Sequence, residues 1–328
     1  STVEMRWDPT LWLLGLSLSV CIGCLLLGTG RGEPKAFSLA AVLLLLLSAG
    51  LAALWSANLL TTIVCWAFYD LALALGLIAA GGRREDAIRA LAVGTGAGLL
   101  LWVGGLMAGG GIGSVQWALM PPGGTKMSFW VLAGLVRLGA YPLHLSLPRH
   151  IRSKSPLVGA FYLSPVLGWG LWIRLALVSD RVFAIRPWMV TPAMLTFVVG
   201  GFLGWTASSP RESRSWIGMG ENGAVMAATV LTAAWGEGVA GQTVVPVMIF
   251  GAVGWMLGTT MLFLGSGFDL SQAFRAKTWH QSIPSLIGSL SLIGAPATVG
   301  FVAESGLVEG VTRNGHWGAG VAFFMGQG

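Results

Sequence analysis

Charged residues are scarce in this sequence. Asp, Glu, Lys and Arg together make up 10% of the 328 residues, whereas hydrophobic residues make up 55%. Soluble domains carry about a quarter charged residues, because charge is needed to cover a surface that faces water. The chain is therefore predicted to be an integral membrane protein whose solvent includes lipid. No polar stretch is long enough to form a separate soluble domain, so residues 1–328 are interpreted as one transmembrane domain.

Cysteines and metal-ligand patterns are also scarce. The three cysteines give no disulfide framework. Cys21 and Cys24 form a C-x-x-C inside an apolar run, where small packing residues are the favoured interpretation over a redox or metal pair. No His, Cys and carboxylate spacing indicates a metal, and no Gly-rich phosphate loop follows a strand. We therefore expect no catalytic residue, metal or cofactor in this chain. The net charge of +6 arises in short loops and does not indicate a nucleic-acid partner.

Long apolar runs are what the sequence has in abundance. A spanning helix needs about 20 apolar residues, and such runs follow one another along the chain. They are continuous rather than alternating, which favours helices over strands. The prediction is an all-α polytopic transmembrane bundle of about ten spans. The runs are Thr10–Gly28, Ala36–Trp55, Asn58–Ala80, Ile88–Gly109, Phe129–Tyr141 with its continuation, Pro156–Leu177, Trp188–Ala207, Ser215–Trp235, Val244–Gly265 and Pro284–Val308, with a further run beginning at Trp317.

The basic residues outside these runs predict an orientation, because Lys and Arg concentrate in cytoplasmic loops. Counted by alternate loops, one side holds twelve: Arg31, Lys35, Arg83, Arg84, Arg89, Arg149, Arg152, Lys154, Arg211, Arg214, Arg275 and Lys277. The other holds six: Arg6, Lys126, Arg174, Arg181, Arg186 and Arg313. The first set is predicted to be cytoplasmic, which leaves the N-terminus outside.

Two of the runs contain sequence that interrupts a helix. The segment RLGAYPLHLSLP carries Pro142 and Pro148, and the segment GAPATVG carries Pro296. Proline removes a backbone donor and kinks a helix. Discontinuous helices near Pro142 and Pro296 are therefore predicted. Broken helices in transporters flank ion paths, whereas a simple proline kink would serve packing alone, and both interpretations stay open.

Apart from Arg89 and Arg174, which lie close to the ends of their runs and are counted with the loops, four charged residues lie inside the runs: Asp70, Arg137, Glu221 and Glu304. A charge at the middle of a bilayer costs at least about 2.5–3.5 kcal/mol, so each is expected to pair, to face water or to be neutral. An Asp70–Arg137 pair would neutralise both members, either as a station on an ion path or as a lock between two helices. Arginine favours the lock, since it cannot release a proton.

The remaining candidates also have two interpretations. Glu221 is placed within two turns of a helix end, where it is solvated or part of the path. Glu304 follows the second interruption, which favours a functional role. His144 follows Pro142 and either carries protons or bonds the carbonyls that the interruption frees. The candidate proton path or buried ion pair therefore comprises Asp70, Arg137, His144, Glu221 and Glu304.

With these residues identified, the chain resembles the proton-conducting antiporter-like family: the large membrane subunits of complex I, membrane hydrogenase relatives and Mrp-type antiporters. The resemblance covers nearly the whole chain and begins at the third helix of the family, so that the first two helices are expected to be missing and the C-terminus truncated. Its best segment is RLGAYPLHLSLPRHIRSKSPLVGAFYLSPVLGWGLWIRL. Arg137 stands at a family lysine, Asp70 at a family glutamate, and Glu304 at the glutamate of a G-x-P…GF-x-x-E motif.

The departures from the family pattern predict weak conduction. The central lysine of the next helix is missing, since Val166, Leu167 and their neighbours are apolar, and Trp255 and Thr259 replace a family His or Lys. Glu221 stands at a family histidine. A proton wire needs titratable stations at close intervals, and the central stretch lacks them.

The resemblance implies a non-catalytic membrane subunit of a complex I-like, redox-driven and proton-translocating assembly, with transport degenerate in this copy. A structural scaffold that has lost transport and an Mrp-type cation/proton antiporter subunit are the alternatives. The expected partners are other membrane subunits and lipids, with quinone bound by neighbouring subunits. The expected location is an energy-transducing membrane such as the bacterial plasma membrane.

Overall fold

The computed structural model describes residues 4–28, 36–109, 115–119, 125–144, 156–178, 187–235, 240–264 and 279–292, together with residues 298 and 305. Within these residues the regular elements are helices, and strand-type pairing occurs only as isolated bridges between Met5 and Ser56 and between Asn58 and Gln116. The all-α prediction is thus confirmed for the part of the chain that the structure describes.

Ten α-helices and two 3₁₀ segments make up the described fold. The helices are α1 (Trp12–Leu27), α2 (Ala36–Leu54), α3 (Leu59–Ala79), α4 (Arg84–Met107), α5 (Thr125–Leu138), α6 (Pro165–Val178), α7 (Pro187–Thr206), α8 (Pro210–Trp235), α9 (Ala240–Leu264) and α11 (Trp279–Leu292), and the 3₁₀ segments are η2 (Trp117–Leu119) and η4 (Pro156–Leu163).

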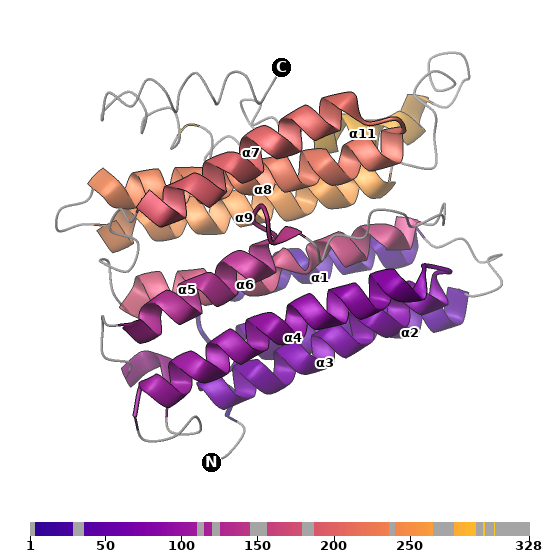
Figure 1. Ribbon diagram of the computed structural model, residues 1–328. Helices are drawn as coiled ribbons and strands as arrows, with labels where there is room; N and C mark the ends of the chain where they lie inside the picture. The colour runs from indigo at the N-terminus through magenta and orange to yellow at the C-terminus, as the bar shows by residue number, and fades with distance from the viewer. Residues whose placement is uncertain are drawn as a thin grey trace.

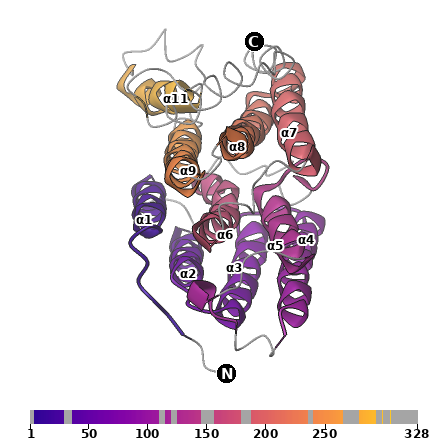
Figure 2. The same ribbon diagram turned by 90° about the vertical axis from the view of Figure 1, so that its left-hand side faces the viewer.

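The helices run roughly side by side in three tiers (Figures 1 and 2). Helices α2, α3 and α4 form one outer tier, α1, α5 and α6 lie in the middle, and α7, α8, α9 and α11 form the other outer tier. Helix α4 packs against both α3 and α5, and α6 packs against both α5 and α9. The middle tier therefore joins the two outer ones.

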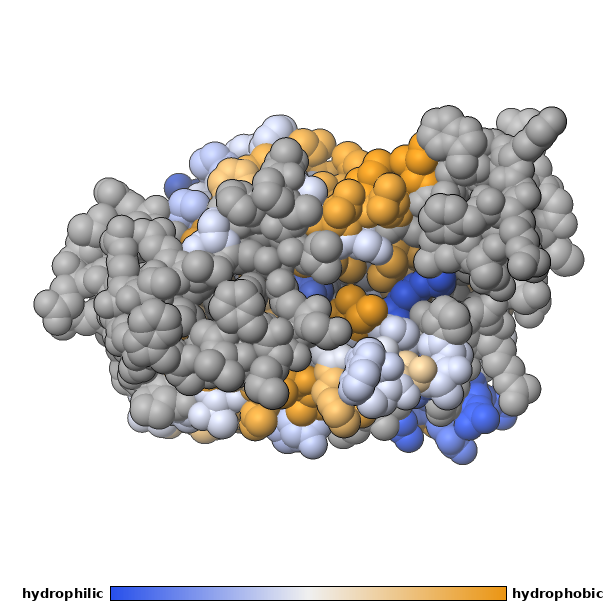
Figure 3. All heavy atoms as spheres, turned by 90° about the horizontal axis from the view of Figure 1, so that it is seen from above, coloured by the Kyte–Doolittle hydropathy of each residue, from blue (hydrophilic) through white to orange (hydrophobic). Residues whose placement is uncertain are grey.

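The surface of the bundle suits lipid. Large apolar side chains are exposed along the helices, among them Leu45, Phe68, Leu99 and Phe202, and Figure 3 shows apolar side chains at the surface of the face seen from above. Four of the described helices are long and apolar enough to cross a membrane, and three more are shorter apolar helices. The chain is an integral membrane protein, and the count of ten spans stays a prediction.

Local chemistry explains where the helices begin. Asn58 caps α3, because its side-chain oxygen accepts hydrogen bonds from the Thr61 N–H at 2.8 Å and the Thr61 hydroxyl at 2.7 Å. Prolines occupy the first residue of η4, α6, α7 and α8, where a missing N–H costs nothing.

One end of the bundle exposes arginines, and the other is joined by backbone hydrogen bonds between separate segments. Arg83, Arg84 and Arg89 are exposed where α4 begins, and we call this the basic end. At the N-terminal end, residues 4–8 lie along the junction between α2 and α3: the N–H of Arg6 donates to the Trp55 carbonyl at 2.7 Å, and that of Ala57 donates to the Glu4 carbonyl at 2.9 Å. Residues 115–117 bond to the same junction from the other side.

The predicted discontinuities are only partly covered by the described residues. Helix α5 ends at Leu138, four positions before Pro142, and the peptide bond between Tyr141 and Pro142 is cis. Pro148 and Pro296 lie outside the described residues. The predicted breaks therefore stay predictions beyond the observed end of α5.

Candidate functional site

Asp70 lies near the middle of α3 and only 3% of it is exposed. On the same helix, Tyr69 and Trp66 are also buried. A carboxylate so far from water needs a countercharge, because an isolated ionised group in a medium of low dielectric constant is strongly unfavourable.

Arg137 supplies that countercharge from the last turn of α5. Its guanidinium donates from Nη2 to Oδ2 of Asp70 at 2.6 Å and from Nη1 to Oδ1, which makes the pair bidentate. Both side chains are about 5% exposed. The guanidinium also lies 4.6 Å from the ring centroid of Trp66, within the range of a cation–π contact. The predicted Asp70–Arg137 pair is therefore present in the structure, buried and fork-to-fork.

The way in which α5 ends places Arg137 in the last turn of the helix. Gly139 adopts φ +70°, a left-handed conformation that other residues rarely take. Its N–H donates to the Val136 carbonyl, and the N–H of Ala140 donates to the Leu135 carbonyl, which is the Schellman arrangement. Arg137 thus occupies the last turn of a helix, where the negative end of the helix dipole favours a cation. Glycine, rather than Pro142, ends the helix.

Gly94 of α4 makes room for the Asp70 carboxylate. A Cβ atom built on Gly94 would collide with the carboxyl carbon and with both carboxylate oxygens. The carboxylate therefore lies directly against the α4 backbone, so that α3, α4 and α5 meet at one point. Sequence reasoning missed Gly94, because one glycine among 49 carries no recognisable signal.

Asn222 of α8 ties the end of α5 to the other half of the bundle. Its side-chain amide donates to the Leu138 carbonyl, one residue after Arg137, and its side-chain oxygen accepts from the Trp169 indole N–H at 2.9 Å. Asn222 is 1% exposed. The predicted candidate was its neighbour Glu221, which is half-buried in α8. Asn222 thus joins α8 to the end of α5.

His144 and Glu304 are the remaining predicted site residues. His144 is buried, and its ring stacks on that of Tyr141 at a centroid distance of 5.3 Å and lies tilted against that of Trp216 at 5.5 Å. Glu304 lies outside the described residues.

The interpretation of the sequence was wrong about a second buried arginine, Arg174. The charge count assigned Arg174 to a loop, but it lies inside α6 and is 6% exposed. Its Nη1 donates to the Ser56 hydroxyl at 2.9 Å, its Nη2 donates to the Leu54 carbonyl, and the guanidinium lies 5.6 Å from the Trp117 ring centroid. The apolar neighbours of Arg174 gave no hint of these partners, which come from distant parts of the chain.

Among the described residues, no group of three or more His, Cys, Asp or Glu side chains is arranged to hold a metal. Cys21, Cys24 and Cys65 are free thiols. What the described residues show at this site is the charge pairing of Asp70 with Arg137.

Comparison with known proteins finds similarity in the fold and not in the sequence. The sequence matches no family model, and no curated protein matches it. Solved structures do match. A chain of the Mrp complex from Dietzia sp. DQ12-45-1b has a TM-score of 0.74 at 19% identity, and the match covers 96% of this chain and 63% of that chain.

Two further matches come from respiratory complexes. A chain of respiratory complex I from Thermus thermophilus with bound NADH has a TM-score of 0.73 at 16% identity, covering 98% of this chain and 72% of that one. A chain of the membrane-bound sulfane sulfur reductase, an archaeal respiratory membrane complex, has a TM-score of 0.77 at 15% identity, covering 96% and 56%. This chain thus spans less than two thirds of the Mrp and reductase chains. The resemblance drawn from the sequence is confirmed at the level of the fold: the chain has the fold of the antiporter-like membrane subunits of these complexes.

Proposed function

We propose that this chain is an antiporter-like membrane subunit of a redox-driven, proton-translocating complex of the complex I type. The observation that carries this proposal is the bidentate Asp70–Arg137 pair, buried in a fold that is shared with chains of complex I, the Mrp complex and the sulfane sulfur reductase. Its partners would be other membrane subunits and lipids, and quinone would bind to a neighbouring subunit. The membrane would be energy-transducing, with the basic end in the cytoplasm and the N-terminus outside.

The pair can act as a local charge switch. Protonation of Asp70 removes the countercharge of Arg137, while Arg137 keeps its own charge because arginine does not deprotonate in proteins. A buried cation without a countercharge is unstable, so that protonation of Asp70 favours movement of Arg137 or of the end of α5. The proton site of this subunit is thus Asp70, and Arg137 responds to its charge.

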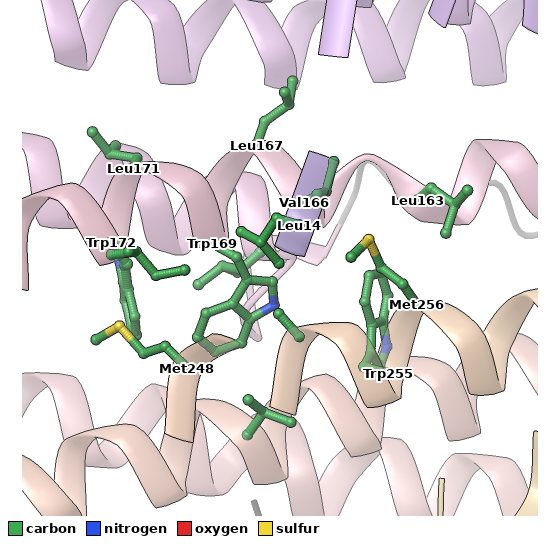
Figure 4. Close-up of a cluster of buried hydrophobic side chains, with 14 of the residues drawn as sticks. Leu14, Leu163, Val166, Leu167, Trp169, Leu171, Trp172, Met248, Trp255 and Met256 are labelled. Carbon is green, nitrogen blue, oxygen red and sulfur yellow. The ribbon is translucent and has the colours of Figure 1, made fainter. Parts of the chain in front are cut away.

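Conduction beyond the pair is interrupted at α6. Figure 4 shows apolar and aromatic side chains of α6 in a buried cluster that also includes Met248, Trp255 and Met256 of α9, and Val166, Leu167, Trp169 and Trp172 are each at most 2% exposed. A continuous proton wire needs titratable groups at close intervals, and these four side chains supply none. We therefore propose that protons bind at Asp70 but do not pass through α6.

A scaffold without transport is the second candidate function. The observation that favours it is the complete neutralisation of Asp70 by Arg137, which locks α3 to α5 whether or not protons move. A scaffold would keep the pair ionised at every stage of the catalytic cycle of the assembly.

The subunit assignment is tested by isolating the chain from its native membrane. We expect it to copurify with membrane subunits and with redox subunits that carry flavin or iron–sulfur groups. Isolation only with cation/proton antiporter subunits would favour the Mrp-type alternative and contradict the proposal.

Measuring redox-driven proton translocation tests whether the path for protons is interrupted at α6. Asp70→Asn combined with Arg137→Gln removes both charges without leaving either of them unpaired. We expect the purified assembly in vesicles to retain most of its redox-driven proton translocation, because the path through this subunit is already closed at α6. Complete loss of pumping with the assembly intact would show that protons do pass through it.

A further inference from the structure

A groove with a volume of about 340 Å³ runs between α2 and α3. The less exposed residues of its lining are small, among them Ala49, Ala52 and Ala72, whereas the larger Phe68 and Leu75 are exposed. Helices α2 and α3 belong to an outer tier of the bundle (Figure 1). The groove therefore opens toward the surroundings of the bundle rather than toward its middle.

The lining of the groove suits hydrocarbon. All of its residues are apolar except Ser48 and Cys65. The Ser48 hydroxyl donates to the Leu45 carbonyl of its own helix at 3.0 Å, and Cys65 is a buried free thiol. A ligand in this groove is therefore held by the van der Waals packing of its hydrocarbon rather than by hydrogen bonds.

The length of the groove matches that of one acyl chain. On α3 the lining extends from Cys65 to Leu75, which corresponds to about 15 Å along the helix axis. The hydrocarbon core of a bilayer is about 30 Å thick, so one leaflet, and with it one extended acyl chain, is about 15 Å deep. Leu75 lies one turn before the last residue of α3, Ala79, and thus about 6 Å from the basic end. A lipid with its headgroup at the basic end can therefore place an acyl chain in the groove.

An exposed apolar strip connects the groove with the arginines of the basic end. Leu75 and Ile78 are both exposed, and because they are three residues apart they share one face of α3. Just after the helix, the N–H of Gly82 donates to the Leu77 carbonyl at 2.8 Å, which folds the turn back against the end of α3. Arg83 is the next residue, so its backbone is held beside the end of the strip.

The charges of the basic end suit a phosphate. Arg83, Arg84 and Arg89 are exposed, Glu85 is the exposed carboxylate among residues 83–89, and Asp86 is buried. Three exposed cations against one exposed anion leave this surface positive, and the positive end of the α4 helix dipole lies at the same place. Arginine binds phosphate through two parallel hydrogen bonds, and basic clusters at a membrane surface attract anionic lipids.

We propose that the α2–α3 groove and the arginines of the basic end together bind one anionic phospholipid. One acyl chain lies in the groove and passes Ile78, and the phosphate pairs with Arg83 and Arg84. The apolar lining alone would also fit a helix of a neighbouring subunit, but the cluster of cations at the end of the groove favours a ligand that combines hydrocarbon with an anionic head. The proposal does not depend on the proposed function, because the site does not include the Asp70–Arg137 pair.

The headgroup is tested with a phosphatidylglycerol that carries a photoreactive diazirine in the middle of one acyl chain. It is added in small amount to phosphatidylcholine nanodiscs that hold the whole chain, and the crosslinked residues are mapped by mass spectrometry. We expect the crosslinks to concentrate on the residues of α2 and α3 that line the groove. Arg83→Gln combined with Arg84→Gln should reduce them by roughly 5-fold for each arginine, about 25-fold together. Arg6→Gln, which removes an exposed arginine at the opposite end of the bundle, is the matched control and is expected to change nothing.

The position of the acyl chain is tested by filling the groove. Ser48→Phe adds a large side chain from an exposed position of the lining, and it should abolish the crosslinks in the groove. Ala92→Phe, at an exposed position of α4 outside the lining, is the control and should leave them unchanged.

Two results would overturn the proposal. Equal crosslinking in the groove by a phosphatidylcholine with the same labelled chain would mean that the groove accepts any acyl chain without selecting the headgroup. A groove that is not crosslinked at all, as expected if a protein helix occupies it, would mean that no lipid binds there. If Ser48→Phe fails to fold, the comparison of the two labelled lipids on the unaltered chain still decides between these outcomes.

Discussion

Arg137 and Arg174 are two buried arginines that the fold stabilises in opposite ways. Arg137 is neutralised by the carboxylate of Asp70. Arg174 has no carboxylate within ion-pair distance among the described residues, and the charge of Asp8 acts on it from further away. It is held instead by a hydroxyl, a carbonyl and an aromatic ring. A buried cation can thus be balanced by a full charge or solvated by neutral dipoles, and only the first arrangement can be switched by a proton.

The largest effect is expected from removing the countercharge alone. Asp70→Asn leaves the Arg137 cation buried without a carboxylate, which should cost about 3–5 kcal/mol of stability. Adding Arg137→Met should recover most of that loss, because no charge is then left in the site. Thermal denaturation of the purified chain in detergent measures both. Equal stability of the single and double variants would mean that the pair is not the reason for the loss.

Filling the space beside the pair should have the next largest effect. Gly94→Ala places a methyl group where the Asp70 carboxylate lies, which should cost about 3 kcal/mol and displace the carboxylate from Arg137. Gly96→Ala is the matched control, since a Cβ there meets nothing within 4 Å. The same denaturation measurement distinguishes them. A loss at Gly96 as large as at Gly94 would point to the helix backbone rather than to the pair.

Loosening the end of α5 should cost less. Asn222→Ala leaves the Leu138 carbonyl and the Trp169 indole N–H without their partner, and about 2 kcal/mol is expected for buried polar groups that lose hydrogen bonds. Glu221→Ala, one residue earlier, is expected to have a smaller effect because its side chain is only half-buried. If Glu221→Ala were the more damaging of the two, the role assigned to Asn222 would be wrong.

The smallest effect is expected at the other arginine. Ser56→Ala removes one neutral acceptor of Arg174, while the Leu54 carbonyl and the Trp117 ring remain, so the cost should be about 1 kcal/mol. Its comparison with Asp70→Asn separates a cation that depends on one countercharge from a cation shared among several dipoles. A loss at Ser56 as large as the loss at Asp70 would remove the distinction between the two sites.

The sequence was sufficient to predict the Asp70–Arg137 pair because charges are rare in long apolar runs and the bilayer forces them to pair. It was not sufficient for Arg174, which lies close enough to the end of its run to be assigned to a loop. The sequence also pointed to Glu221 rather than Asn222, because a charged residue in an apolar run stands out from its neighbours and a neutral amide does not. Asn222 bonds to Leu138 and Trp169, which lie 84 and 53 residues away from it in the chain.

By itself, the sequence determined the solvent and the class of the fold. Scarce charge and repeated apolar runs leave lipid and helices as the physical solution, since backbone groups in a bilayer must be bonded within the segment. Only the tertiary structure decided which side chains meet. Gly94 matters because the Asp70 carboxylate reaches the backbone of another helix. Helix packing creates these contacts, and no local pattern encodes them.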